Sequence, residues 1–125
     1  MELALQQFLE DTVRAEETPK DSLTVMNGPE DGRVHPLTKD LTTIGRLDSN
    51  DVALQFDLAA SRSHARIVRE TGGYFVEDLG STHGTEVDGA RVAGRAALRD
   101  GGLLLVGETL LRARLRGGPL PGAPQ

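Results

Sequence analysis

One strictly alternating segment restricts the possible folds of this chain more than any other feature. In the run Leu111-Arg112-Ala113-Arg114-Leu115-Arg116, the apolar side chains share one face of an extended backbone and the arginines share the other. This is the pattern of a half-buried antiparallel strand. The chain also holds 15 glycines but only one tyrosine and three phenylalanines. Short strands separated by glycine-rich turns predict an all-β sandwich or barrel.

Further strands are expected at several places between polar turns. The segments Ser63–Arg69 and Tyr74–Asp78 flank Glu70-Thr71-Gly72-Gly73, which predicts a β-hairpin. The remaining expected strands cover 22–26, 33–37, 41–44 and 51–54, and the first of them stops at the turn sequence Asn27-Gly28-Pro29.

Length and composition exclude several classes of protein. A chain of 125 residues is long enough for one domain. It contains no cysteine, which excludes disulfides and thiolate metal sites. The longest apolar run, Leu103–Val106, is far too short to span a membrane, and the first residues do not resemble a secretion signal. We therefore expect a soluble cytoplasmic protein with no membrane partner.

Charge is distributed unevenly along the chain. The net charge is −5, and residues 1–21 contain six acidic and two basic side chains. The rest of the chain is nearly neutral and lacks the basic excess of a nucleic-acid-binding surface, so nucleic acid is not an expected partner. We therefore predict three segments: an acidic leader (1–21), a domain (22–116) and a flexible Pro/Gly-rich tail (117–125).

The leader has a helical pattern of its own. Leu5, Phe8, Leu9, Thr12 and Val13 fall at helical spacing, so residues 2–14 are expected to form a short amphipathic helix or to remain disordered. A helix of this length is marginal alone in water and needs a surface on which to lie.

Three polar clusters occur where expected strands end. They are Gly45-Arg46, Ser61-Arg62-Ser63-His64 and Gly80-Ser81-Thr82-His83-Gly84-Thr85. Guanidinium groups, hydroxyls and glycine backbone in loops, with no carboxylate among them, suit an anion with several oxygens. The clusters therefore predict a phosphate-like ligand.

The order of these clusters closely resembles the signature of the forkhead-associated (FHA) domain. The matching strings are Ile44-Gly45-Arg46, Asn50-Asp51-Val52, Ser61-Arg62-Ser63-His64-Ala65, Asp78-Leu79-Gly80-Ser81-Thr82-His83-Gly84-Thr85 and Asp88-Gly89. Several motifs in one order are far more specific than any single one. The resemblance covers about residues 22–116 and implies an eleven-stranded antiparallel β-sandwich.

The resemblance also implies a role for each matching residue. Arg46 would be the main phosphate ligand, with Ser61, Arg62 and Thr82 completing phosphate capture. Two further side chains, Asn50 and His64, would brace the loops. The glycines that would form turns there include Gly45 and Gly84.

Two positions depart from the family pattern. His83 stands where the family usually has an asparagine that holds the main chain of the bound peptide. Histidine cannot reproduce both halves of an amide, so we expect a weaker or pH-dependent grip on the peptide. Asp88 replaces a second asparagine in a turn, where the two residues are near equivalents.

The function implied by the resemblance is binding of phosphothreonine-containing proteins downstream of a Ser/Thr kinase. The alternative is a phosphate-independent interaction module that uses another face of the sandwich. Ser61, His64 and Asp78 include the residue types of a hydrolase triad, but no nucleophile-elbow motif surrounds the serine. His35, His64 and His83 match no zinc spacing. We therefore predict no enzyme activity, no cofactor and no metal.

The leader also contains potential phosphorylation sites. Thr18 lies three residues before Asp21, and members of the family often favour aspartate at that position after the phosphothreonine. One hypothesis is that phosphorylated Thr18, or alternatively Thr12, binds the pocket of its own or a second molecule. The other interpretation is a plain acidic, disordered leader.

Overall fold

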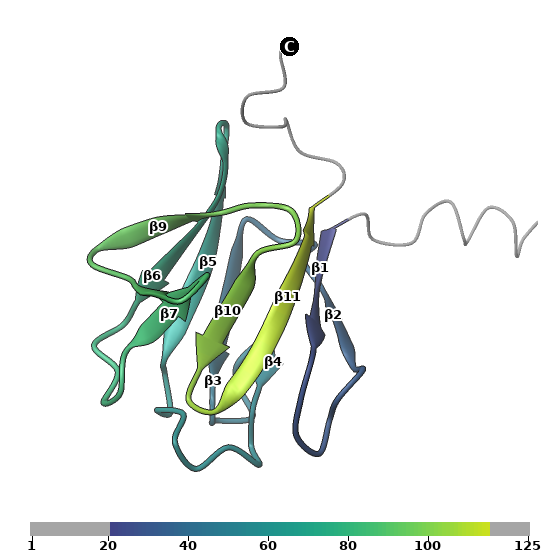
Figure 1. Ribbon diagram of the computed structural model, residues 1–125, viewed down its shortest axis with the longest axis vertical. Coiled ribbons are helices and arrows are strands. Elements are labelled where there is room, and N and C mark those ends of the chain that lie inside the picture. The colour runs from purple at the N-terminus through teal and green to yellow at the C-terminus, as the bar shows by residue number, and fades with distance from the viewer. Residues whose placement is uncertain (1–20, 116–125) are drawn as a thin grey trace, which may run out of the picture.

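Eleven strands form two sheets in the computed structural model, which describes residues 21–115 (Figure 1). The six-stranded sheet has the order β2-β1-β11-β10-β7-β8. Its strands are β1 (Asp21–Val25), β2 (Val34–Pro36), β7 (Thr85–Val87), β8 (Ala90–Arg91), β10 (Leu103–Val106) and β11 (Thr109–Leu115). The expected all-β sandwich with eleven strands is confirmed.

The second sheet has five strands in the order β4-β3-β5-β6-β9. They are β3 (Leu41–Gly45), β4 (Val52–Ala53), β5 (Ala65–Glu70), β6 (Gly73–Asp78) and β9 (Arg95–Leu98). β3 and β4 pair in parallel, unlike the wholly antiparallel arrangement that was expected. The cause is local: the Thr43 N–H donates to Asp51 Oδ2 at 2.9 Å, and the Asp51 N–H donates to Thr43 Oγ1 at 3.0 Å. These bonds bring the chain back beside β3 before β4 begins.

The alternation in β11 places its apolar side chains in the core, as predicted. Leu111 is fully buried and Ala113 is 1% exposed, whereas Arg112 and Arg114 are exposed. The core lies between the sheets and also receives Leu23, Val25, Ile44, Ile67, Val76, Leu104 and Val106. At about 1.5–3 kcal/mol for each large apolar side chain, this burial is the main stabilising contribution.

The predicted hairpin joins β5 and β6. Glu70 pairs with Gly73 across the two residues Thr71 and Gly72. A second tight hairpin joins β7 and β8 through Asp88 and Gly89, both of which have positive φ (52° and 84°). Aspartate tolerates this conformation as asparagine does, which explains its presence in that turn.

The first strand begins one residue earlier than expected, at Asp21. Asp21 is 8% exposed, and its carboxylate accepts a hydrogen bond of 2.6 Å from the Tyr74 hydroxyl on the opposite sheet. Burial, together with this hydrogen bond, raises the pKa of Tyr74 to about 12. The expected leader helix (2–14) and the tail (117–125) lie outside the described residues.

The two ends of the sandwich differ in content. Asp21 pairs with Leu115, so β1 begins and β11 ends at the same end, which is the upper one in Figure 1. The loops β3–β4 (46–51), β4–β5 (54–64) and β6–β7 (79–84) lie at the lower end. Within residues 21–115 the structure contains no helix long and apolar enough to cross a membrane.

Candidate functional site

The three polar clusters of the sequence meet at the lower end of the sandwich. Arg46 follows β3, and its backbone N–H donates to Ser61 O at 2.9 Å. Its side-chain Nε donates to Ala60 O at 3.0 Å. One guanidinium nitrogen thus fixes the side chain against the β4–β5 loop. The terminal N–H groups of Arg46 make no hydrogen bond to any residue of the described range and remain available to a ligand.

Gly45 permits this close approach of two loops. A Cβ atom at this position would lie 2.2 Å from Arg62 O and 2.8 Å from Asn50 Nδ2. No side chain fits in that space, because either the loop backbone or the Asn50 amide would have to move. Glycine therefore sets how closely the loop carrying Arg46 packs on the loop carrying Ser61.

Asn50 holds the β3–β4 loop from inside. Its Nδ2 donates to Leu47 O at 2.9 Å and to Arg62 O at 2.8 Å. Both protons of the amide are thereby used, one within its own loop and one across to the neighbouring loop. Asn50 is therefore a positioning residue for Arg46 rather than a ligand donor.

Ser61 links the other two loops. Its Oγ accepts a hydrogen bond of 3.0 Å from the Thr82 N–H, and its own N–H donates to His64 Nδ1 at 3.0 Å. The Ser61 hydroxyl proton is engaged by no other described residue. Oγ accepts this one hydrogen bond, and its O–H remains free to rotate and donate to an incoming anion.

His64 is completely buried beneath the site. Since Nδ1 accepts the Ser61 N–H, the proton must be on Nε2, which donates to Gly84 O at 2.8 Å. The imidazole in this neutral form joins the β4–β5 and β6–β7 loops. The geometry gives His64 a bracing position with no access to a ligand.

Asp78, which the sequence motifs did not place among the site residues, organises the β6–β7 loop. Its Oδ2 accepts the Gly80 and Ser81 N–H groups at 2.9 and 3.0 Å, and its Oδ1 accepts the Ser81 and Thr85 hydroxyls, each at 2.6 Å. Burial raises the pKa of this carboxyl, but the hydrogen bonds outweigh it and hold the pKa below the usual value. An aspartate two residues before a glycine and three before a serine was the available signal, because it is typical of an Asx turn.

The other expected ligands are exposed. Arg62, Thr82 and His83 lie on the surface of the loops, and no side-chain hydrogen bond to another described residue holds them. Arg62 contributes to the loop framework only through its backbone carbonyl, and Thr82 through its N–H. The side chains of all three are therefore free to contact a ligand.

Arg91 on β8 is a further cation at the site that the motifs did not indicate. A Cβ atom on Gly84 would lie 2.6 Å from the Nε, Cζ and Nη2 atoms of Arg91, so this guanidinium covers the glycine. Gly84 has a φ of 86°, which also favours glycine. The β7–β8 hairpin brings Arg91 to this loop, and its two-residue Asp88-Gly89 turn was the available signal in the sequence.

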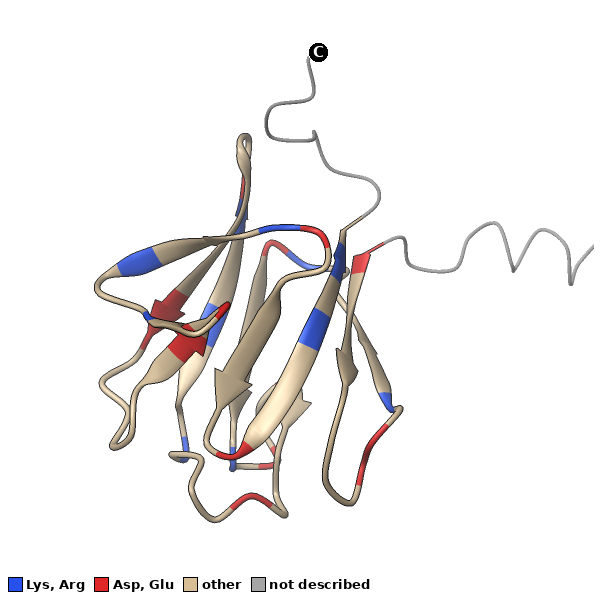
Figure 2. Cartoon of the chain, viewed as in Figure 1, with Lys and Arg blue, Asp and Glu red and all other residues tan. Residues whose placement is uncertain are grey.

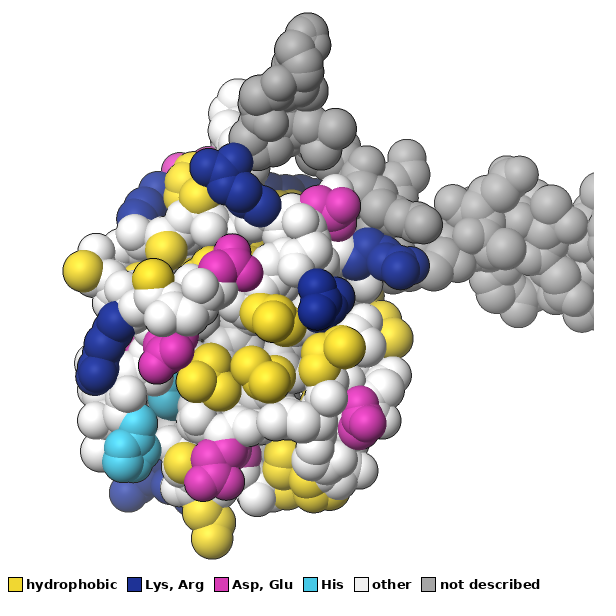
Figure 3. All heavy atoms as spheres, viewed as in Figure 1, with side chains coloured by type: hydrophobic (Ala, Val, Ile, Leu, Met, Phe, Trp, Pro, Cys, Tyr) yellow, Lys and Arg dark blue, Asp and Glu magenta, His cyan; other side chains and the backbone are white. Residues whose placement is uncertain are grey.

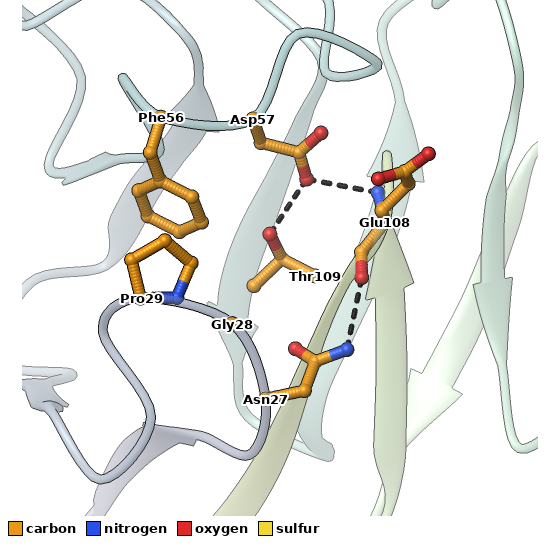
Figure 4. A pocket seen from close by; sticks show the side chains of 7 residues that line it. All are labelled: Asn27, Gly28, Pro29, Phe56, Asp57, Glu108 and Thr109. Atoms are coloured by element: carbon orange, nitrogen blue, oxygen red, sulfur yellow. Dashed lines mark hydrogen bonds between the residues drawn. The ribbon is translucent and has the colours of Figure 1, made fainter.

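A small depression of about 220 Å³ adjoins the β4–β5 loop (Figure 4). Asp57 at its side is 4% exposed, and its Oδ2 accepts the Glu108 N–H at 2.8 Å and the Thr109 hydroxyl at 2.6 Å. Phe56 lies against Pro29 of the β1–β2 turn (Figure 4). These contacts anchor the start of the loop that carries Ser61.

Arginines at the site differ from those on the five-stranded sheet in their partners. Arg66 and Arg95 both pair with Glu77, at 2.7 Å each, and Arg95 also pairs with Glu70 at 3.0 Å. By contrast, Arg46, Arg62 and Arg91 form no ion pair with an acidic residue of the described range. Figure 2 shows both basic and acidic residues at this loop end. The three guanidinium groups of the site are therefore not neutralised by ion pairs with described residues and can attract an anion.

The geometry does not assemble the residues considered for catalysis or metal binding. His64 accepts from the backbone of Ser61 rather than from its hydroxyl, and Asp78 bonds to the β6–β7 loop rather than to His64. Between residues 21 and 115 there is no group of three or more His, Cys, Asp or Glu side chains that could hold a metal ion.

Comparison with known sequences agrees with these observations. The sequence model of the FHA domain matches residues 42–107. The FHA domain-containing protein FhaB of Mycobacterium tuberculosis is 35% identical over 92 residues, which is 74% of this chain and 59% of FhaB. The chain thus spans well under two-thirds of the length of this relative.

Solved structures match the whole sandwich. An FHA domain from a structural and functional analysis of phosphothreonine-dependent FHA interactions superposes with a TM-score of 0.69 at 29% identity, covering 80% of this chain and 98% of its own. Mycobacterium tuberculosis EmbR in complex with a low-affinity phosphopeptide gives a TM-score of 0.69 at 27% identity, covering 94% of this chain and 32% of EmbR.

Proposed function

The chain belongs to the FHA domain family, and on that premise we propose that it binds phosphothreonine-containing segments of proteins modified by a Ser/Thr kinase. One observation carries the proposal: Arg46 and Ser61 are fixed by their neighbours, yet the terminal guanidinium N–H groups and the hydroxyl proton have no described partner. A phosphate group supplies the missing acceptors. The proposal includes a cytoplasmic location, and the recognition makes or breaks no covalent bond.

The recognition depends on charge. A phosphothreonine carries nearly two negative charges and three strong acceptor oxygens, whereas an unmodified threonine carries a single hydroxyl. A hydrogen bond to a charged group contributes about 1.5–3 kcal/mol. Arg46 and Ser61 supply one such bond each at the least, so removal of the phosphate weakens binding by roughly a hundredfold or more.

Surrounding donors extend the contact beyond the phosphate. The exposed hydroxyl of Thr82 and the guanidinium of Arg62 are free to reach further phosphate oxygens or the peptide backbone. His83 projects from the same loop and offers a single hydrogen bond to the peptide, fewer than an amide would. The peptide main chain is therefore held less tightly here than the phosphate.

The acidic leader is a candidate ligand, and its reach decides how it could bind. Asp21 lies at the end opposite to the site (Figure 1), and β1 alone has five residues, or about 17 Å. Thr18, three residues before Asp21, reaches at most about 11 Å. We propose that phosphorylated Thr18 binds only a second molecule, whereas Thr12, nine residues away, can span about 30 Å and serve either molecule.

Asp21 places a further condition on Thr18. The aspartate expected to follow the phosphothreonine by three residues is the first residue of β1 and accepts the Tyr74 hydroxyl. For Asp21 to contact the pocket of a partner molecule, the start of β1 would have to separate from its sheet. Thr12 is therefore the favoured phosphorylation site, because binding of phosphorylated Thr12 at the pocket leaves the sandwich intact.

A second candidate function does not depend on phosphate. Partly exposed leucines on the outer face of the six-stranded sheet give the sandwich another surface for a protein partner. The two functions are distinguishable, because only phosphothreonine binding needs Arg46.

The test is a titration with fluorescent peptides. Peptides covering residues 16–23 with Thr18, and 8–16 with Thr12, are compared in phosphorylated and unmodified form, together with a degenerate phosphothreonine library. Arg46→Ala is the test variant, and Arg99→Ala is the matched control, because it removes the same charge from the loop at the opposite end.

We expect the phosphorylated forms alone to bind, Arg46→Ala to abolish binding and Arg99→Ala to leave it unchanged. Library binding without leader binding would overturn self-recognition but keep the proposed function. Failure of the whole library to bind would overturn phosphothreonine recognition itself.

A further inference from the structure

The outer face of the six-stranded sheet is more apolar than a solvent-facing sheet needs to be. In β10, Leu104 and Val106 are completely buried, so the alternate residues Leu103 and Leu105 point outward, where both are partly exposed. A strand with one wet face normally alternates apolar and polar residues. The side chains of β10 do not alternate between apolar and polar, whereas those of β11 beside it do from Leu111 to Leu115.

Neighbouring strands extend this apolar surface. Leu105 pairs with Leu110 of β11, which also points outward and is partly exposed. Val34 of β2 is also 55% exposed, but Thr24 and Arg112 separate it from Leu103 in the sheet. Figure 3 shows hydrophobic side chains gathered at the middle of this face, with charged side chains around them. We call Leu103, Leu105 and Leu110 the leucine patch.

Charged side chains of both signs border the leucine patch, because Glu86 of β7 pairs with Leu105 on one side and arginines of β11 lie on the other. Leu103 pairs directly with Arg112, and Arg114 follows on the same face of β11. Arg112 donates from Nη1 to Gly101 O at 2.9 Å, and neither arginine has a carboxylate partner between residues 21 and 115. On its β11 side the patch therefore suits an occupant that combines an apolar face with an acidic side chain.

The first 14 residues of the chain have this chemistry. At helical spacing, Leu5, Phe8, Leu9 and Val13 form one stripe. At the 100° per residue of a helix, Glu10 and Asp11 lie about 120° and 140° from the middle of that stripe, on opposite sides of it. When such a helix runs along the strands, one of these acids is on the β11 side.

We propose that residues 2–14 dock on the leucine patch of their own molecule as an amphipathic helix that runs along the strands, with one acidic side chain on the side of Arg112 and Arg114. The connection permits it, because the leader enters β1 at Asp21, and β1 pairs with β11 in this sheet. Residues 15–20 can span about 20 Å, enough to turn the chain back over the face.

Dimensions and tethering favour this occupant over a second copy. A helix of 13 residues is about 20 Å long, and the seven residues of β11 extend over about 23 Å. A short helix is marginal alone in water but gains from an apolar surface. A leader attached to the same sheet has a high effective concentration there, which a free molecule lacks.

The test uses the full chain, which has no cysteine of its own. Gln7→Cys places a nitroxide spin label on the side of the helix away from the stripe. Amide signals of an isotope-labelled sample are then compared before and after reduction of the label. We expect severalfold loss of intensity at residues 103–105 and 110–112, and little loss at β5 and β6 of the opposite sheet.

Substitutions in the leader distinguish specific docking from proximity through the tether, and they leave the folded domain unchanged. Leu5→Ser combined with Phe8→Ser and Leu9→Ser should abolish the intensity loss, whereas the matched change Gln6→Ser should preserve it. Arg112→Gln with Arg114→Gln should reduce the loss, and so should high salt, which screens the acid–arginine contacts.

Three results would overturn the proposal. The first is no localised loss. The second is loss centred on the loops carrying Arg46, Ser61 and Thr82, which would place the leader at the phosphate site. The third is loss in a mixture of spin-labelled protein and isotope-labelled protein without the label, which would identify the leader of a second copy as the occupant.

Discussion

His64 donates from Nε2 to the carbonyl oxygen of Gly84 at 2.8 Å, so a completely buried imidazole joins the two loops that carry Ser61 and Thr82. Its other nitrogen holds the Ser61 N–H. The surface donors of the site are thus positioned from below by a residue that never meets the ligand.

Replacing this histidine should therefore damage both stability and binding. His64→Ala leaves the Ser61 N–H and Gly84 O without their partner and opens a cavity, so we expect the free energy of unfolding to fall by about 2–4 kcal/mol. Chemical denaturation measures the loss. His83→Ala, an exposed change in the neighbouring loop, should stay within about 0.5 kcal/mol. Equal effects from both variants would refute the bracing role.

Ser61→Ala should affect binding more than stability. It removes the hydroxyl that we assign to a phosphate oxygen, so the affinity for a phosphothreonine peptide should fall roughly tenfold to hundredfold. Titration with a fluorescent phosphothreonine peptide measures this change, with Ser63→Ala, an exposed serine two residues away, as the control. An unchanged affinity in Ser61→Ala would exclude the hydroxyl from phosphate contact.

Gly45→Ala should disturb the packing of two loops. The added Cβ would lie 2.2 Å from Arg62 O, and the backbone shift needed to relieve this costs about 1–3 kcal/mol or more. Gly72→Ala is the matched control, because no atom lies within 4 Å of its Cβ position. Thermal unfolding of the two variants should differ clearly. Similar unfolding temperatures for the two variants would show that the two loops can move apart without loss of stability.

Arg91→Gln should weaken binding of acidic phosphopeptides. The guanidinium lies over Gly84 at the edge of the site, so its charge attracts acidic residues beside the phosphothreonine. An exposed charge contributes about 0.2–1 kcal/mol, so we expect up to about a fivefold loss at low salt that diminishes at high salt. Arg99→Gln should cause no such loss. If the two variants behave alike, Arg91 has no contact with the peptide.

Asp78 should make part of the stability depend on pH. Its pKa is lower in the folded chain than its ordinary value because hydrogen bonds to the carboxylate outweigh burial. The carboxylate therefore stabilises the fold above the ordinary pKa of 3.8, and this contribution is lost as the pH falls through the lower folded value. Asp78→Asn should be less stable than the parent at neutral pH, and the difference should narrow on acidification. Denaturation curves at several pH values decide this. A constant difference would contradict it.

Local patterns in the sequence were sufficient for strands β1 to β6 and β11 and for the family, but they did not predict β7 to β10. The alternation of β11 predicted which side chains are buried, because successive residues of a strand point to opposite faces wherever the strand lies. The β5–β6 hairpin followed from the glycines between two apolar runs. The order of the Arg46, Ser61 and Thr82 clusters was enough to identify an FHA domain, because each cluster is a short continuous string of residues.

Contacts between distant segments could only come from the tertiary structure. The packing of the sandwich joins the Tyr74 hydroxyl to Asp21 and the Thr109 hydroxyl to Asp57, each across more than 50 residues of chain. It also decides that β1 begins at the end opposite to the site, which limits the reach of Thr18. Side-chain alternation and turn preference act over a few residues, so they specify strands and motifs. Which strands become neighbours depends on the joint burial of residues far apart in the chain, and only the folded sandwich determines it.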